Sequence, residues 1–213
     1  MTTPRRVGAE TSKTRDLLLD CAEQLMVAEG YPAVTYRALA AKAEVTAALV
    51  QYYFPTRDDI FIAAIRRRSA QNLERLRRGL EKNPDEPLRV LWRFSQDEST
   101  AALTTEFLAI GNHRPAIREE IAKATNDARR VQLEGLRAFA NATGTAAIEL
   151  PVEALLFLVT GTTRLIRLEE GVGVSTTHAE VLRAFESFLD ATETLQGDGP
   201  HHNAPPAATR KRH

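Results

Sequence analysis

The sequence has little of what covalent chemistry or membrane insertion requires. Cys21 is the only cysteine among 213 residues, so no disulfide can form within the chain. No apolar run approaches the roughly 18 residues of a membrane-spanning helix, and the polar first ten residues lead into no apolar signal segment. From these absences we expect a cytoplasmic protein with no membrane partner.

Catalytic and metal-binding patterns are missing as well. Three of the five histidines, His201, His202 and His213, lie in the last 13 residues. The other two, His113 and His178, have no cysteine or second histidine at a metal-binding spacing. The sequence contains no glycine-rich phosphate loop, nucleophile elbow or HExxH motif. We therefore expect neither an enzyme nor a bound cofactor or metal.

The formal net charge is zero, but the charges are unevenly distributed. Residues 1–78 carry 13 Lys and Arg against 9 Asp and Glu, whereas the remaining residues carry 15 against 19. A basic front and an acidic back are typical of a protein that contacts phosphate with one end only.

Residues 35–57 have the pattern of two short helices joined by a tight turn. Thr35 and Thr46 are suitable N-caps, because a threonine hydroxyl accepts a hydrogen bond from an amide of the first turn. Pro55 ends the second helix, since the residue before a proline is pushed out of the α region. Thr56 and Asp59 then form a capping box for the next helix. This arrangement is the helix-turn-helix of DNA-binding proteins.

The second helix of the pair has two distinct faces. The apolar side, which we expect to be buried, consists of Leu49, Val50, Tyr53 and Phe54. The outer side consists of Ala47, Ala48, Gln51 and Tyr52. In a recognition helix, Gln51 can bond the N6 and N7 edge of an adenine, and the two alanines suit thymine methyl groups. We predict that Ala47, Ala48 and Gln51 read bases.

Groups around the helix pair are suited to holding the DNA backbone. Hydroxyls, helix N-termini and guanidinium groups are common partners of phosphate oxygens. The predicted phosphate contacts are Thr35, Thr46, Tyr52, Tyr53 and Arg57. The Tyr53 ring also falls on the apolar side, so an alternative is that only its hydroxyl reaches outward. Arg5 and Arg6 are a candidate basic arm for an adjacent groove.

At these residues the chain resembles the TetR-like (tetracycline-repressor) family of bacterial transcription regulators. The resemblance covers roughly residues 10–65 and rests on Thr35, Leu39-Ala40, Ala43, Val45-Thr46, Tyr52-Tyr53-Phe54-Pro55 and Arg57. It implies the same three base-reading positions. Two residues depart from the family pattern: Glu44 stands where glycine is usual, and Gln51 stands where tyrosine is usual. We expect the first to strain the turn and the second to change what is read on DNA.

The rest of the chain is expected to be helical, which makes the fold all-α. The predicted helices span residues 11–29, 57–80, 87–97, 99–111, 115–140, 152–170 and 177–195. We expect an N-terminal three-helix DNA-binding domain and a C-terminal helical domain for ligand binding and dimerisation. The predicted segments are a disordered basic arm at 1–10, the helix-turn-helix domain at 11–57, a connecting helix at 58–80, the C-terminal domain at 81–196 and a disordered tail at 197–213.

Cys21 falls on an apolar helix face, which favours a structural thiol over a redox sensor.

A single recognition helix makes too few contacts for specific binding, so we expect a homodimer that reads half-sites about one DNA turn (~34 Å) apart or more. The last two helices are apolar enough to form the interface, and the resemblance implies the same four-helix arrangement. The predicted interface residues are Leu155, Leu158, Leu165, Phe185, Phe188 and Leu189. Some of them can instead belong to the core of the chain itself.

The middle helices are expected to enclose an effector pocket. Its predicted lining is Trp92, Phe107, Ile110, His113 and Thr162. The alternative is that Trp92 and Phe107 are core residues and that His113 is a cap or surface residue. The resemblance implies that a small apolar ligand in this pocket changes the spacing of the two DNA-reading heads.

Together these patterns predict a sequence-specific regulator that binds double-stranded operator DNA, and specifically a repressor released by a small apolar ligand. One alternative is a helical ligand-binding or adaptor protein without specific DNA binding, which Glu44 and Gln51 favour. Another is a helical enzyme, which a pocket of converging ionisable groups would support.

Overall fold

The computed structural model describes residues 5–143 and 150–194, and within these ranges the chain forms helices and turns with no strand. The all-α fold is thereby confirmed. The first four residues of the predicted arm and the whole predicted tail, 197–213, lie outside the described residues.

Ten helical segments follow one another along the described chain. They are α1 (Arg5–Glu29), the short 3-10 helix η1 (Tyr31–Ala33), α2 (Tyr36–Lys42), α3 (Ala47–Tyr53), α4 (Arg57–Lys82), α5 (Pro87–Ser95), α6 (Glu98–Gly111), α7 (Pro115–Thr143), α8 (Val152–Glu170) and α9 (His178–Thr194).

The start of α1 corrects one expectation. Residues 5–10 belong to this helix instead of a disordered arm. Their polarity suggested disorder, yet Arg, Ala and Glu are strong helix formers and no proline follows Pro4 in this stretch. Because the apolar stripe that begins near Leu17 stabilises the following turns, the helix extends backward into the polar segment.

The three predicted threonine caps are present. Thr35 Oγ1 accepts a hydrogen bond from the Ala38 amide (3.1 Å), and Thr46 Oγ1 accepts one from the Leu49 amide (3.2 Å). Thr56 forms the complete capping box with Asp59. Helices of seven residues are marginal by themselves, so these caps and tertiary packing together hold α2 and α3 in place.

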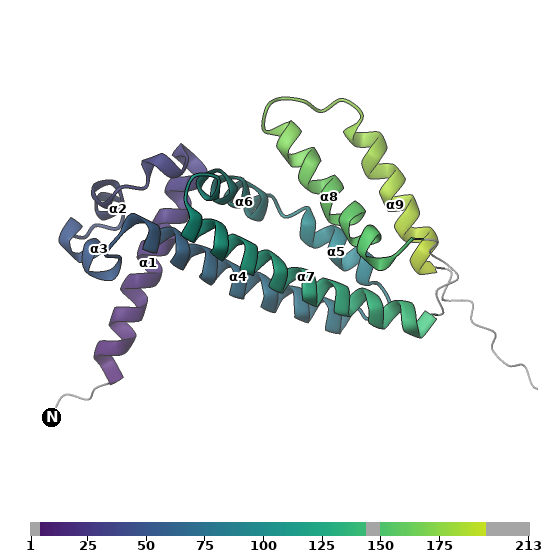
Figure 1. Ribbon diagram of the computed structural model, residues 1–213, viewed down its shortest axis with the longest axis horizontal. Coiled ribbons are helices and arrows are strands. Elements are labelled where there is room, and N and C mark those ends of the chain that lie inside the picture. The colour runs from purple at the N-terminus through teal and green to yellow at the C-terminus, as the bar shows by residue number, and fades with distance from the viewer. Residues whose placement is uncertain (1–4, 144–149, 195–213) are drawn as a thin grey trace, which may run out of the picture.

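The molecule is elongated, with the seven-residue helices α2 and α3 at one end (Figure 1). Helices α1, α2 and α3 form a head, α4 and α7 lie side by side along the long axis, and α8 and α9 form a hairpin toward the other end (Figure 1). No helix in the described ranges combines the length and the hydropathy that crossing a membrane would take.

The buried side chains form two clusters. The first joins the head to the start of α4 and includes Leu103, Phe107 and Ile110 of α6. The second lies among α4, α5, α7, α8 and α9, with Trp92 among its largest members. Because α6 contributes to the core of the head, a movement of α6 reaches the head through direct packing.

Cys21 is buried in the first cluster. Burial raises the pKa of its thiol above the usual value, which keeps it protonated and unreactive near neutral pH. This environment agrees with a structural thiol.

Candidate nucleic-acid interface and ligand cavity

Helix α3 turns a small, polar face to solvent. Ala47, Ala48 and Gln51 are exposed, and the Tyr52 side chain is 75% exposed. On the opposite side Val50 and Phe54 are buried in the core of the head. The two faces are therefore those predicted from periodicity, and the three predicted base-reading side chains are free to meet a groove. That they read bases stays a prediction.

The end of α3 is fastened to α2 by a tyrosine hydroxyl. Tyr36 Oη donates to the carbonyl oxygens of Phe54 (3.0 Å) and Pro55 (2.9 Å). Burial, with the nearby Asp59 carboxylate, raises the pKa of Tyr36, so the hydroxyl keeps its proton and remains a donor. The Arg15 guanidinium of α1 lies 5.3 Å from the centroid of the Phe54 ring. Helices α1, α2 and α3 are thus held as one unit.

The turn between α2 and α3 contains the strained residue that the sequence suggested. Glu44 has φ of 55°, in the left-handed region. The Val45 amide after it donates to the Ala40 carbonyl at 2.9 Å, which keeps the turn closed. Because a side chain at such a φ clashes with its own backbone, this turn is built at a cost that glycine would avoid.

Glu44→Gly is therefore expected to raise the free energy of unfolding by about 0.5–1 kcal/mol. This gain is the strain relieved in the folded protein, reduced by the greater conformational freedom that glycine has in the unfolded chain. Urea denaturation measures this difference. As a matched control, Glu81→Gly in the exposed last turn of α4 should lower stability, because φ is helical there. A stability loss from Glu44→Gly would show that the left-handed turn carries no strain.

The predicted phosphate contacts fall into two groups. Thr35, Thr46 and Tyr52 are exposed around the head, whereas Tyr53 is half-buried with its ring edge-on to Tyr52 at 5.4 Å. Arg57 has another role: its Nε donates to the Val34 carbonyl (3.0 Å) and one terminal nitrogen donates to the Pro32 carbonyl (3.4 Å). Its guanidinium therefore fastens the bend before α2, and only its remaining N–H groups are available to phosphate.

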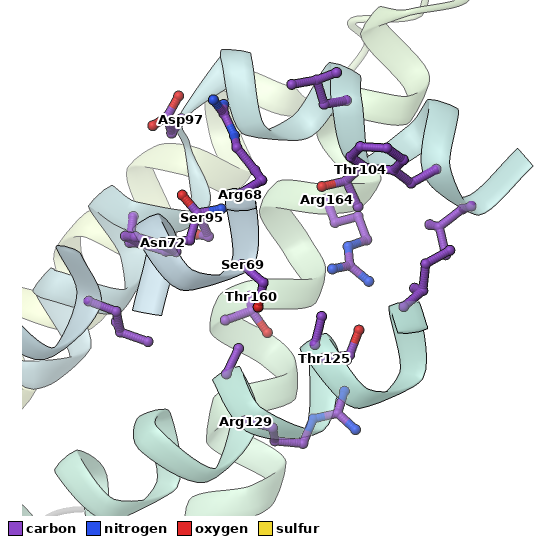
Figure 2. Close-up of a pocket in the computed structure, with 18 of the residues that line it drawn as sticks. Arg68, Ser69, Asn72, Ser95, Asp97, Thr104, Thr125, Arg129, Thr160 and Arg164 are labelled. Atoms are coloured by element: carbon purple, nitrogen blue, oxygen red, sulfur yellow. The ribbon is translucent and has the colours of Figure 1, made fainter. Parts of the chain in front are cut away.

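A cavity of about 330 Å³ lies between α4, α5, α6, α7 and α8 (Figure 2). Much of its wall is apolar, with side chains that include Leu103, Phe107, Leu108, Ile121, Phe157 and Leu168. The polar part contains the hydroxyl side chains labelled in Figure 2, Ser69, Ser95, Thr104, Thr125 and Thr160. Its volume is at the lower end of the ~300–1,000 Å³ usual for small-molecule sites.

Only Phe107 of the five predicted pocket residues lines this cavity. Trp92 is buried away from it, stacked on Phe185 (4.8 Å between centroids), and its Nε1 donates to Glu186 at 2.8 Å. Ile110 belongs to the core of the head. His113 is exposed at the turn after α6, and Thr162 of α8 also lies outside the lining. The prediction was wrong for these four because spacing along a helix defines its faces but does not show which face meets a cavity.

The sequence interpretation missed the arginines of the cavity. Arg68, Arg129, Arg164 and Arg167 line it, together with one acidic residue, Asp97. A signal was available: Arg164 has the same helical spacing on α8 as the cavity residues Phe157, Gly161 and Leu168. Arginine stays protonated in proteins and cannot act as a general base. The converging ionisable groups therefore suit binding and do not support the enzyme alternative.

The six predicted interface residues are not one surface. Leu155 (1% exposed) and Leu189 (0%) are buried in the core of their own chain, so they cannot meet a partner. The half-buried Phe185 packs on Trp92. Leu158 (47% exposed), Leu165 (57% exposed) and Phe188 remain on the surface of α8 and α9. The apolar composition indicated the right helices but could not separate core from surface.

Helix α6 connects the cavity wall to the head through charged groups. The Glu106 carboxylate accepts a hydrogen bond from the Tyr31 amide at 2.7 Å, next to the cavity residues Thr105 and Phe107. In the turn between α6 and α7, Arg114 pairs with Asp58 in the first turn of α4. A displacement of α6 would therefore pull on the backbone that leads into α2.

Comparison with known proteins agrees with this architecture. Residues 18–64 match the model of the family described as "Bacterial regulatory proteins, tetR family". These residues contain the second half of α1, the whole helix pair and the start of α4. No curated protein matches the chain as a relative.

Several experimental structures share the whole fold at low sequence identity. A transcriptional regulator from Saccharomonospora viridis in complex with choline has a TM-score of 0.71 at 16% identity, covering 84% of this chain and 96% of its own. A TetR transcription regulator from Haloarcula marismortui has a TM-score of 0.66 at 15% identity, with coverages of 85% and 98%. The reduced form of E. coli NemR gives 0.61 at 18% identity, with coverages of 86% and 96%.

Proposed function

Because the chain belongs to the TetR family of DNA-binding transcriptional regulators, we propose that it acts as a homodimeric repressor that a small ligand releases from its operator. The exposed Ala47, Ala48 and Gln51 face of α3, held by the buried Val50 and Phe54, is the observation that carries the proposal. Since its partner is chromosomal DNA, the protein would work in the cytoplasm. The family is one of regulators and not of enzymes.

The side-chain amide of Gln51 would read one base pair of the operator. Gln51→Ala is expected to weaken operator binding by about 1–3 kcal/mol and to relax the preference at that base pair, because a bidentate contact to an adenine is lost. Fluorescence anisotropy against DNA flanking the regulator's own gene, with single base-pair changes, measures both effects.

Gln71→Ala is the matched control, since Gln71 is also an exposed glutamine but lies on α4 outside the head. It should leave affinity unchanged. Equal affinities of the Gln51 and Gln71 variants for every duplex would exclude α3 as the reading helix.

A homodimer would use the surface leucines of α8. By helical spacing, Leu158 and Leu165 lie between the face buried in the chain's own core and the face that lines the cavity. The two leucines, seven residues apart, form an apolar strip on α8, and Phe188 is an exposed apolar side chain of α9, the other helix of the hairpin. Two copies of such a hairpin would pack as a four-helix bundle about a two-fold axis.

Release would operate through α6. A ligand in the cavity contacts this helix directly, and the helix reaches the head through its buried apolar residues and through Glu106. The ligand must prefer one spacing of the two heads by a few kcal/mol, because equal affinity for both conformations would shift nothing.

The charges of the cavity argue against a ligand like the one bound in a similar structure. The Saccharomonospora viridis regulator holds choline, a quaternary ammonium cation. Four arginines against one aspartate would repel such a cation here. We therefore propose a ligand with a mainly apolar body that is not a cation.

A further inference from the structure

Most charges on the cavity wall already have partners. Asp97 pairs with Arg75, which does not line the cavity, at 2.9 Å. Arg167 pairs with Glu170 at 2.8 Å and also donates to the Gln96 carbonyl. Arg68 lies 3.7 Å from Glu23 of α1. The charges of these three lining residues are therefore at least partly balanced by the protein itself.

Arg129 and Arg164 differ from the other charged residues of the wall. Among the side chains that the structure describes, which leave out those of residues 5–12, 98–101, 143, 193 and 194, no carboxylate pairs with either of them. The Arg129 guanidinium lies over the Phe157 ring, 4.5 Å from its centroid. In Figure 2 the two guanidinium groups, from α7 and α8, point toward a common region with Thr125 between them in that view.

Two permanent positive charges at one cavity repel each other, and an anion between them removes that repulsion. Arginine is well suited to this task, since its planar N–H groups match the oxygens of carboxylate, sulfonate and phosphate. The cation–π contact orients Arg129 before a ligand arrives, which reduces the entropy lost on binding.

We propose that the ligand is an anion with an apolar body, whose acidic group binds between Arg129 and Arg164. Its body would cover Leu108, Phe157 and Leu168, large apolar side chains that line the cavity and are partly exposed to solvent. This proposal rests on the proposed function, because it names the class of ligand for the same cavity.

A matched pair of fluorescent probes tests the charge requirement. Anilinonaphthalene sulfonate and phenylnaphthylamine share one aromatic skeleton, and only the first carries an anionic group. A second pair, decanoate and decanol, covers flexible bodies and is measured by displacement of the fluorescent probe. We expect each anion to bind the full-length protein about 10-fold more tightly than its neutral partner, with a preference that falls as salt is added.

Arg129→Gln and Arg164→Gln should each lower the affinity for the anions about 10-fold and change that for the neutral probes less than about twofold. Arg130→Gln is the control, because Arg130 is the next residue on α7, is exposed and pairs with Asp127 outside the cavity. It should leave both probes unaffected. Glutamine keeps most of the side-chain length, and circular dichroism checks that each variant folds.

The proposal is overturned if neither anion is preferred over its neutral partner, or if the Arg129 and Arg164 variants bind the anions like the Arg130 control. The Gln51 experiment contains no ligand, so its failure would affect the proposed DNA reading alone. Anion binding that depends on the two arginines but leaves operator binding unchanged would support the ligand class and contradict the release mechanism.

Discussion

Phe54→Ala is expected to lower the free energy of unfolding by about 3–5 kcal/mol, the range for removing a fully buried aromatic side chain. The Phe54 ring is 1% exposed, packs in the core of the head and lies beneath the Arg15 guanidinium. Whole domains are commonly stable by only ~5–15 kcal/mol, so this loss would unfold much of the head. Thermal and urea denaturation measure the change directly.

Tyr52→Ala is the companion variant that separates folding from DNA binding. Tyr52 stands two residues earlier on the same helix, but its side chain is 75% exposed. Its removal should change stability by less than about 0.5 kcal/mol, as for most surface positions. Operator affinity should still fall, because the predicted contact between the Tyr52 side chain and a DNA phosphate is lost. If the two variants destabilise equally, α3 does not have the inner and outer faces described here.

Leu165→Glu is expected to convert the proposed homodimer into monomers. Burial of a leucine side chain contributes about 1.5–3 kcal/mol, and a two-fold interface contains the residue twice. The two introduced carboxylates, one from each copy, would also be desolvated in the proposed interface. The dimer dissociation constant should therefore rise at least ~100-fold, with a corresponding loss of operator affinity. Sedimentation velocity over a concentration series measures the dissociation constant.

Val27→Glu provides the control for that substitution. Val27 is an exposed apolar residue on α1, remote from the α8–α9 hairpin, so the same change there should leave the dimer intact. A Leu165→Glu protein that sediments as the wild type does would rule out this strip of α8 as the dimer surface.

Local features of the head were predictable because adjacent residues determine them. The threonine caps, the end of α3 before Pro55 and the two faces of α3 depend on spacing and on hydrogen bonds within a few residues. The left-handed φ of Glu44 could likewise be expected, because the family resemblance implies glycine at this position. These are short-range constraints, so the sequence indicates them locally, although tertiary packing is still needed to hold helices of seven residues in place.

Properties that depend on the packing of distant helices were not predictable in the same way. Helix periodicity predicted an apolar face for α8, but Leu155 is core whereas Leu165 is surface. Arg57 was predicted to contact phosphate, but spacing could not show that its Nε also donates to the Val34 carbonyl, 23 residues away. Arg129 and Arg164 are separated by a long stretch of chain, and only the packing of α7 against α8 brings them to one cavity.

The sequence by itself therefore determined that this protein is all-helical, that it carries a capped helix-turn-helix, and which side of α3 faces outward. The tertiary structure decided where the cavity lies, that arginines line it, and which leucines are left for a partner. The physical reason is that spacing along a helix defines a face, whereas the neighbour that covers the face is set by the packing of distant segments.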